Sequence, residues 1–103
     1  DVQATLIDCT VDSIANAISA LFPPEEIYVC GGGAHNDVLM SKLKSAMPYT
    51  TVLTTSQLRI DPDWVEAVSF AWMAKQTIEG HKTDTSAFTG ATEPVVLGGI
   101  FSV

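Results

Sequence analysis

Hydrophobic residues along the chain alternate between helical spacing and short continuous runs typical of strands. This pattern predicts the order helix–strand–helix–strand–helix. Apolar residues recur at helical spacing from Val2 to Leu21, which predicts a helix that is interrupted near Thr10 and ended by Pro23-Pro24. The continuous apolar run Ile27–Cys30 then predicts a short strand buried on both faces, as in a parallel sheet covered by helices.

A second helix and a second strand follow. We expect Asn36 to cap a helix that Pro48 closes and whose apolar stripe consists of Val38, Leu39, Leu43 and Met47. The β-branched run Thr50–Thr54 predicts the next strand. A connection of this length between two strands predicts a right-handed parallel crossover.

The third helix has clear boundary signals after a loop at residues 56–60. Asp61 is expected as its N-cap, Pro62 at its first position, Asp63 in its acidic first turn, and Gly80 just beyond its end at Glu79. Beyond a polar loop, the glycine-containing tail predicts irregular structure with a short strand near Val95–Leu97. The class is therefore α/β, but two strands are too few for an independent sheet, so the 103 residues indicate part of a larger domain.

Composition supports the incomplete domain and excludes two classes of partner. A hydrophobic content of 47% is high for a small free-standing domain and indicates packing against a further part. Five basic against twelve acidic residues exclude a nucleic-acid-binding footprint, and no apolar run is long enough to span a membrane. Cys9 and Cys30 lie in apolar surroundings far apart, so we expect core thiols in a reducing compartment and no metal site.

The most informative chemistry follows the first strand, where Gly31-Gly32-Gly33 precedes a helical pattern. Glycines permit a positive φ and the close approach of a ligand, and helix amides favour negative charge, so a phosphate or nucleotide is expected here. The alternative is that the glycines serve only the turn. A P-loop and the dinucleotide fingerprint are both disfavoured, because the required lysine, third glycine and acidic residue are missing.

Glu66 is the second candidate, since it lies in the otherwise apolar stretch from Trp64 to Ala74. A carboxylate there serves a polar cavity, faces solvent on a half-exposed helix, or caps backbone amides from the first turn. For Asp61 and Asp63 we favour helix capping over catalysis, and for His35 a loop position over a phosphate contact. Core packing is expected of Trp64, Phe70 and Trp72, and Thr89-Gly90-Ala91 is a weak candidate anion site.

Four segments together resemble the C-terminal part of anhydro-N-acetylmuramic acid kinases, in order and spacing and over almost the whole chain. These segments are DVQATL (residues 1–6), VCGGGAHN (29–36), IDPDWVEAVSFAWMA (60–74) and TGATEPVVLGGIF (89–101). The resemblance implies the actin/Hsp70-like (ribonuclease H-like) fold of the sugar kinase superfamily. Residues 1–103 would then be the C-terminal part of the second of two lobes that close over ATP and Mg²⁺.

The resemblance also implies the activity and the site residues. Such kinases open 1,6-anhydro-N-acetylmuramic acid with water and phosphorylate it to N-acetylmuramic acid 6-phosphate, in cytoplasmic peptidoglycan recycling, and they are typically homodimers. Gly31, Gly32, Gly33 and Asn36 would bind the nucleotide, and Glu66 would line the sugar site. The catalytic aspartate would lie in the missing N-terminal part, so the 103 residues alone are expected to be inactive.

Two positions depart from the family pattern, and other functions stay open. Arg59 stands where the family commonly has glycine, and Asp37 stands where proline often follows the asparagine. The main alternative is a non-catalytic nucleotide-binding or chaperone-like module of the same superfamily, which has no need of Glu66 in a DWxEA setting. A plain structural α/β domain is the third reading.

Overall fold

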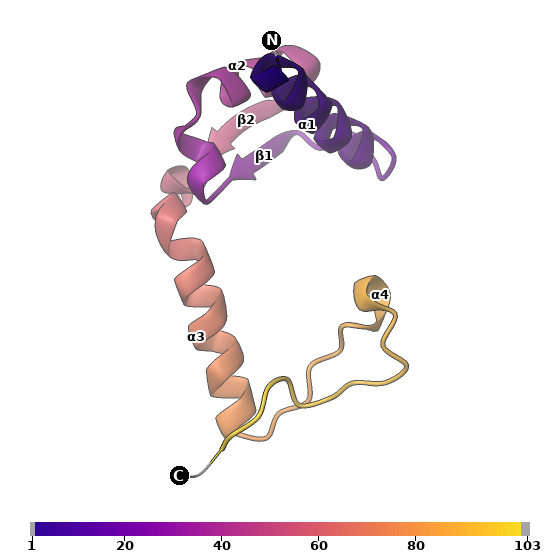
Figure 1. Ribbon diagram of the computed structural model, residues 1–103, viewed down its shortest axis with the longest axis vertical. Helices are drawn as coiled ribbons and strands as arrows, with labels where there is room; N and C mark the ends of the chain where they lie inside the picture. The colour runs from indigo at the N-terminus through magenta and orange to yellow at the C-terminus, as the bar shows by residue number, and fades with distance from the viewer. Residues whose placement is uncertain (1, 102–103) are drawn as a thin grey trace. The chain divides into compact units, whose positions relative to one another are not determined.

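A computed structural model describes residues 2–101 and shows an α/β arrangement (Figure 1). The chain divides into two compact units, one reaching to Val65 and one starting at Glu66. The first holds α1 (Val2–Ser19), β1 (Glu26–Val29), α2 (Asp37–Ala46) and β2 (Thr51–Thr54), with 3-10 turns η1 (Gly32–His35), η2 (Thr55–Leu58) and η3 (Pro62–Trp64). The second holds nearly all of α3 (Val65–Ile78) and the single turn α4 (Ser86–Thr89).

The two strands pair in parallel, as the strand–helix–strand spacing predicts. The register runs from Glu26 opposite Thr51 to Val29 opposite Thr54. Parallel pairing brings the carboxyl ends of β1 and β2 to the same edge of the sheet, where ligands of open α/β sheets bind. The expected burial of the first strand on both faces is wrong for this chain, because Val52 is the only buried residue of either described strand.

A small core lies where α1, α2 and the sheet meet. It consists of Val11, Met40, Leu43 and Val52, with partly buried Ile7, Ile14, Ile27, Val29 and Leu39 around it. Lys42 of α2 also forms an ion pair with Asp8 of α1. The stripe predicted for the second helix is therefore confirmed at Leu43 and Met47, but it missed Met40 and wrongly included Val38, which is 53% exposed.

The first helix differs from its prediction at Thr10 and at its end. Thr10 does not interrupt α1, which runs unbroken through it, and its Oγ1 donates to the Leu6 carbonyl at 2.8 Å. The helix ends at Ser19, before the prolines. A hydrogen bond from Leu21 N to Ile18 O, 3.1 Å long, tightens its last turn.

The boundary signals of the third helix are confirmed. Asp61 Oδ1 accepts from Asp63 N at 2.9 Å, and Pro62 occupies the first position of η3, which leads directly into α3. At the other end Gly80 has φ of 68°, and His81 N donates to Gln76 O at 2.9 Å. A left-handed glycine together with this hydrogen bond between residues 76 and 81 forms a Schellman motif, which ends the helix.

The tail is mostly irregular, as expected, but its details differ from the prediction. The strand expected near Val95–Leu97 is reduced to one antiparallel bridge between Thr83 and Val95. The unpredicted turn α4 begins beside Asp84, whose Oδ1 accepts from Ser86 N at 2.9 Å. Hydrogen bonds from the Ser86 side chain and backbone lower the pKa of the Asp84 carboxyl below its ordinary value.

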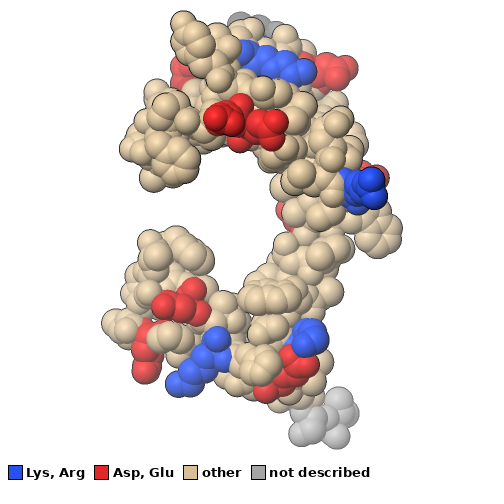
Figure 2. All heavy atoms as spheres, turned by 180° about the vertical axis from the view of Figure 1, so that it is seen from behind, with Lys and Arg blue, Asp and Glu red and all other residues tan. Residues whose placement is uncertain are grey.

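The third helix is apolar, but it buries none of its described side chains. Trp64, Phe70 and Trp72, expected in a core, are 64%, 67% and 52% exposed. In the view of Figure 2, residues other than Lys, Arg, Asp and Glu make up most of the visible surface. The expected burial of the thiols is also wrong here, because Cys9 and Cys30 are exposed. Both results fit a chain that lacks the part against which these surfaces pack.

Candidate functional site

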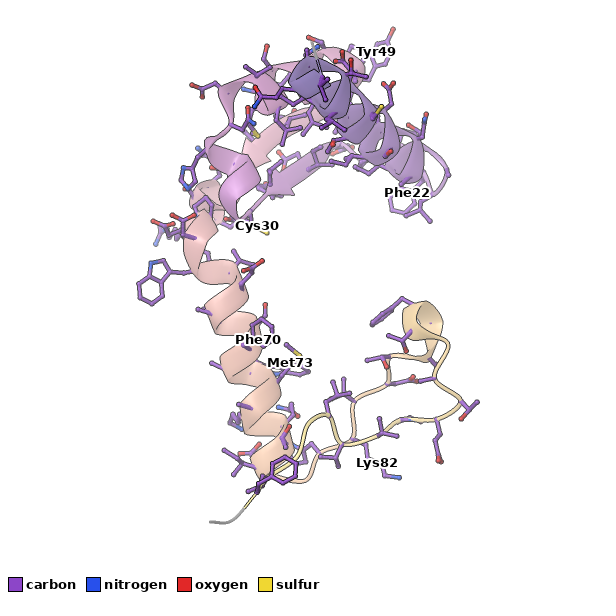
Figure 3. All side chains as sticks on the ribbon, in the orientation of Figure 1. Phe22, Cys30, Tyr49, Phe70, Met73 and Lys82 are labelled. Atoms are coloured by element: carbon purple, nitrogen blue, oxygen red, sulfur yellow. The ribbon has the colours of Figure 1, made fainter. Side chains whose placement is uncertain are left out.

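The glycine-rich turn lies at the carboxyl end of β1, beside the end of β2. Val29 pairs with Thr54, so Cys30 and Gly31 leave the sheet next to Thr55. Figure 3 shows Cys30 at this end of the strand. The glycines lie in the turn that precedes the second helix, as predicted. They form the 3-10 turn η1, and α2 begins only at Asp37.

The described residues explain two of the three glycines but not the third. Gly31 has φ 69° and ψ −169°, a region that is essentially restricted to glycine. A Cβ on Gly33 would lie 3.3 Å from Leu39 Cδ2, so close packing onto α2 accounts for that position. Gly32 has no positive φ, and a Cβ there would meet nothing within 4 Å in the described chain. Only Gly32 thus lacks a reason within these residues.

The glycine turn has backbone N–H groups that can donate hydrogen bonds to a ligand. The first amides of any helical turn have no carbonyl partner within it, and in η1 these belong to Gly32 and Gly33. Gly31 is different, because its N–H donates to the Pro62 carbonyl at 2.9 Å. The turn can therefore present two neighbouring donors to an anionic group, which is the chemistry of a phosphate cradle.

Asn36 caps α2, as predicted. Its Oδ1 accepts from Leu39 N at 3.0 Å and its backbone N–H donates to Gly33 O at 3.1 Å. This cap fixes the turn against the helix. The expected contact with a nucleotide phosphate would use the side-chain amide nitrogen, because a phosphate oxygen accepts and needs a donor.

His35 and Asp63, treated from sequence as a loop residue and a helix-capping residue, contact each other. His35 Nε2 lies 2.8 Å from Asp63 Oδ1, and each side chain is 60% exposed. Asp61 confirms its capping role by accepting from Asp63 N. The structure therefore joins the GGGAH and DPDW segments, which are 28 residues apart. Sequence spacing alone carried no signal for this contact.

Thr55 is a further polar residue at this edge that sequence reasoning missed. It is 9% exposed, and its hydroxyl is buried without a hydrogen-bond partner among residues 2–101. An unpaired buried hydroxyl costs free energy. It directly follows the β-branched run Thr50–Thr54, which predicts only a strand.

Arg59 has φ 63°, the only positive φ of a non-glycine residue in the described chain. It follows η2, where its N–H donates to Ser56 O at 3.0 Å. A left-handed residue with a side chain is strained, whereas glycine is not. The position at which the resemblance expects glycine is thus one whose backbone favours glycine.

Glu66 lies in the first turn of α3, within the second unit. It is exposed and takes part in no ion pair among residues 2–101. The second unit also contains an apolar groove of about 580 Å³, bordered by Phe70 and Met73 of α3 and by residues 97–100 of the tail. Figure 3 shows Phe70 and Met73 projecting from this helix.

Neither the weak anion site nor a metal site gains support from the structure. Gly90 has φ 75°, but the Thr89 hydroxyl already donates to Thr85 O and accepts from Ala91 N at 3.3 Å. Across residues 2–101 no group of three or more His, Cys, Asp or Glu side chains could hold a metal ion. None of the helices in that range is long and apolar enough to cross a membrane.

The comparisons with known proteins agree on one family. The family model described as anhydro-N-acetylmuramic acid kinase matches residues 1–103. Curated proteins of that name from Thiobacillus denitrificans and Shewanella pealeana are 47% and 45% identical to the chain, over 96% and 98% of its length. One from Shewanella loihica is 46% identical over 98%. The chain spans 27% of the length of each relative. It belongs to the anhydro-N-acetylmuramic acid kinase family.

Proposed function

We propose that this chain is the nucleotide-binding part of a kinase that opens 1,6-anhydro-N-acetylmuramic acid with water and phosphorylates it with ATP and Mg²⁺. The product would be N-acetylmuramic acid 6-phosphate. Family membership supports the reaction, and the glycine turn at the carboxyl edge of parallel strands supports the nucleotide site. The C-terminal placement within an actin/Hsp70-like lobe, the cytoplasmic location and the homodimer belong to the same proposal.

The observation that carries the nucleotide site is Gly32. Packing explains Gly33 and backbone conformation explains Gly31, but neither explains Gly32. A ligand whose phosphate approaches the backbone supplies the missing reason, because a Cβ would occupy its space. We place the nucleotide against the amides of Gly32 and Gly33, with Gly31 and Asn36 holding the turn and the Asn36 amide nitrogen free to contact the ligand.

Glu66 is proposed to line the sugar site. Its carboxylate has no ion-pair partner in the described chain, so it is free to accept a hydrogen bond from a sugar hydroxyl. The general base that activates water is proposed to lie outside these residues. Phosphoryl transfer depends on positioning and electrostatic stabilisation, which half of a nucleotide clamp cannot supply, so the chain alone is expected to be inactive.

A coupled ADP-release assay on the full-length gene product tests the proposal. With 1,6-anhydro-N-acetylmuramic acid and ATP-Mg²⁺, we expect turnover that Glu66→Gln lowers about a hundredfold or more, as is typical when a substrate-positioning group is lost. Glu79→Gln is the matched control. Glu79 pairs with Lys75, so this variant should leave turnover unchanged. Full activity in Glu66→Gln would return Glu66 to a solvent-facing role.

Gly32→Ala tests the nucleotide site in the same assay. The added methyl meets no described atom, so the thermal midpoint should stay unchanged while the KM for ATP rises about tenfold or more. Gly33→Ala is the contrasting variant, because its methyl presses on Leu39 and should lower stability. An unchanged KM in Gly32→Ala would remove the main support for a phosphate at this turn.

A further inference from the structure

Two contacts fasten the glycine turn to the segment that precedes α3. Gly31 N donates to Pro62 O at 2.9 Å, and His35 Nε2 lies 2.8 Å from Asp63 Oδ1. The first contact holds the beginning of the turn and the second holds its end. The Gly32 and Gly33 amides, proposed above to face the nucleotide, lie between these two points.

The backbone that carries the Asp63 side chain has a restrained conformation. Pro62 is buried and has a restricted φ, and the Asp61 carboxylate accepts from the Asp63 amide at 2.9 Å. The backbone that leads into Asp63 is therefore held in place. Because a carboxylate only accepts, the proton of this hydrogen bond belongs to His35 Nε2.

We propose that His35 and Asp63 form a positioning pair that sets the direction of the Gly32 and Gly33 amides and thereby the affinity for the triphosphate of the nucleotide. This inference rests on the proposed nucleotide site. Neither residue touches the ligand in this account. The imidazole also engages the Asp63 carboxylate, which reduces its repulsion of an anionic ligand beside the turn.

Positioning explains this pair better than stability does. A histidine–carboxylate contact between side chains that are both 60% exposed contributes little to the free energy of folding. Holding donors in a fixed geometry, by contrast, affects every interaction that they make with a ligand. A variant that loses the pair should therefore bind nucleotide more weakly while unfolding at nearly the same temperature.

A double-mutant cycle on the full-length gene product tests this pair. His35→Ala, Asp63→Ala and the double variant are titrated with Mg²⁺ and the non-hydrolysable analogue AMP-PNP, and their thermal midpoints are recorded. We expect each single variant to weaken binding about three- to tenfold. The double variant should weaken binding no more than the worse single variant does, because the effects of coupled residues are not additive. His35→Gln should restore part of the affinity, because its amide also donates.

His81→Ala is the matched control. His81 is 61% exposed and its Nδ1 lies 3.4 Å from a carboxylate oxygen of Glu79, so it makes a comparable histidine–carboxylate contact within the second unit. Its affinity for AMP-PNP should equal that of the wild type. Additive losses, equal weakening by His81→Ala, or a lower midpoint with unchanged affinity would each overturn the inference.

Direct binding also separates this inference from the proposed reaction. A wild-type protein that binds AMP-PNP but turns over no anhydro-sugar would refute the reaction, and the cycle would still decide the role of the pair. A wild-type protein that does not bind AMP-PNP would refute both the nucleotide site and the pair.

Discussion

At the residue scale, backbone conformation explains one departure from the family pattern. Arg59 has φ 63°, where a side chain costs about 1 kcal/mol or more and glycine costs nothing. Arg59→Gly should therefore raise the thermal midpoint of the full-length protein by one to a few degrees. The expected gain is about 1 kcal/mol from the relieved backbone strain, reduced by the larger conformational entropy that glycine gives the unfolded chain. Arg59→Ala keeps the Cβ and should give no rise. A lower midpoint for the glycine variant would show that the Arg59 side chain makes a stabilising contact.

Thr55 provides a second test at this scale, because its buried hydroxyl has no partner in the described chain. Thr55→Val keeps the shape and removes the unpaired group, so the free energy of unfolding should stay equal or rise by about 1 kcal/mol. Thr55→Ser retains the hydroxyl, leaves a small cavity and should destabilise. Destabilisation by valine of more than about 1 kcal/mol would mean that the hydroxyl has a partner in the full-length protein.

At the element scale, α2 links the core to the glycine turn. Leu43 is 1% exposed between α1 and the sheet, so Leu43→Ala should cost about 2–5 kcal/mol of unfolding free energy. Val38→Ala on the same helix is the control, since Val38 is 53% exposed and the change should stay within about 0.5 kcal/mol. Denaturant unfolding of the full-length protein measures both. Equal costs would contradict the assignment of the buried face.

The cap of α2 separates two roles of Asn36. Asn36→Asp keeps an oxygen that can accept from Leu39 N, so stability should be retained. The same change replaces the amide nitrogen by a negative charge, so AMP-PNP binding should weaken if Asn36 contacts the nucleotide. Unchanged affinity together with unchanged stability would limit Asn36 to capping.

The element boundaries were largely predictable because they depend on local chemistry. Asn36, Asp61-Pro62 and Gly80 mark helix ends through hydrogen bonds and φ values that neighbouring residues determine. The contact of His35 with Asp63 was not predictable, because it depends on how two segments 28 residues apart approach each other. Periodicity likewise could not show that Met40, rather than Val38, faces α1.

At the scale of the whole molecule, exposed apolar surface is the main observation. The apolar sequence of the third helix predicts an interior position, but Phe70 and Trp72 are more than half exposed here. Burial depends on the rest of a protein, and the chain spans 27% of the length of its relatives. The exposure of residues expected in a core, including both cysteines, within residues 2–101 fits a chain that is part of a larger protein.

This surface predicts a difference between the chain alone and the full-length protein. Acrylamide should quench the fluorescence of Trp64 and Trp72 strongly in the isolated chain, because both are more than half exposed. Quenching of the same two residues should fall severalfold in the full-length protein, measured by difference against Trp→Phe variants. Equal quenching in both forms would contradict the account that α3 packs against the rest of the kinase.

The central claim, that the glycine turn holds the nucleotide, is tested most directly by hydrogen exchange. The full-length protein is compared with and without AMP-PNP and Mg²⁺. We predict slower exchange in peptides covering residues 31–36 and no change in peptides covering Thr89–Ala91, where the hydroxyl and amide already bond each other. Unchanged exchange at residues 31–36 with saturating nucleotide would contradict the account and leave the glycines as a structural turn.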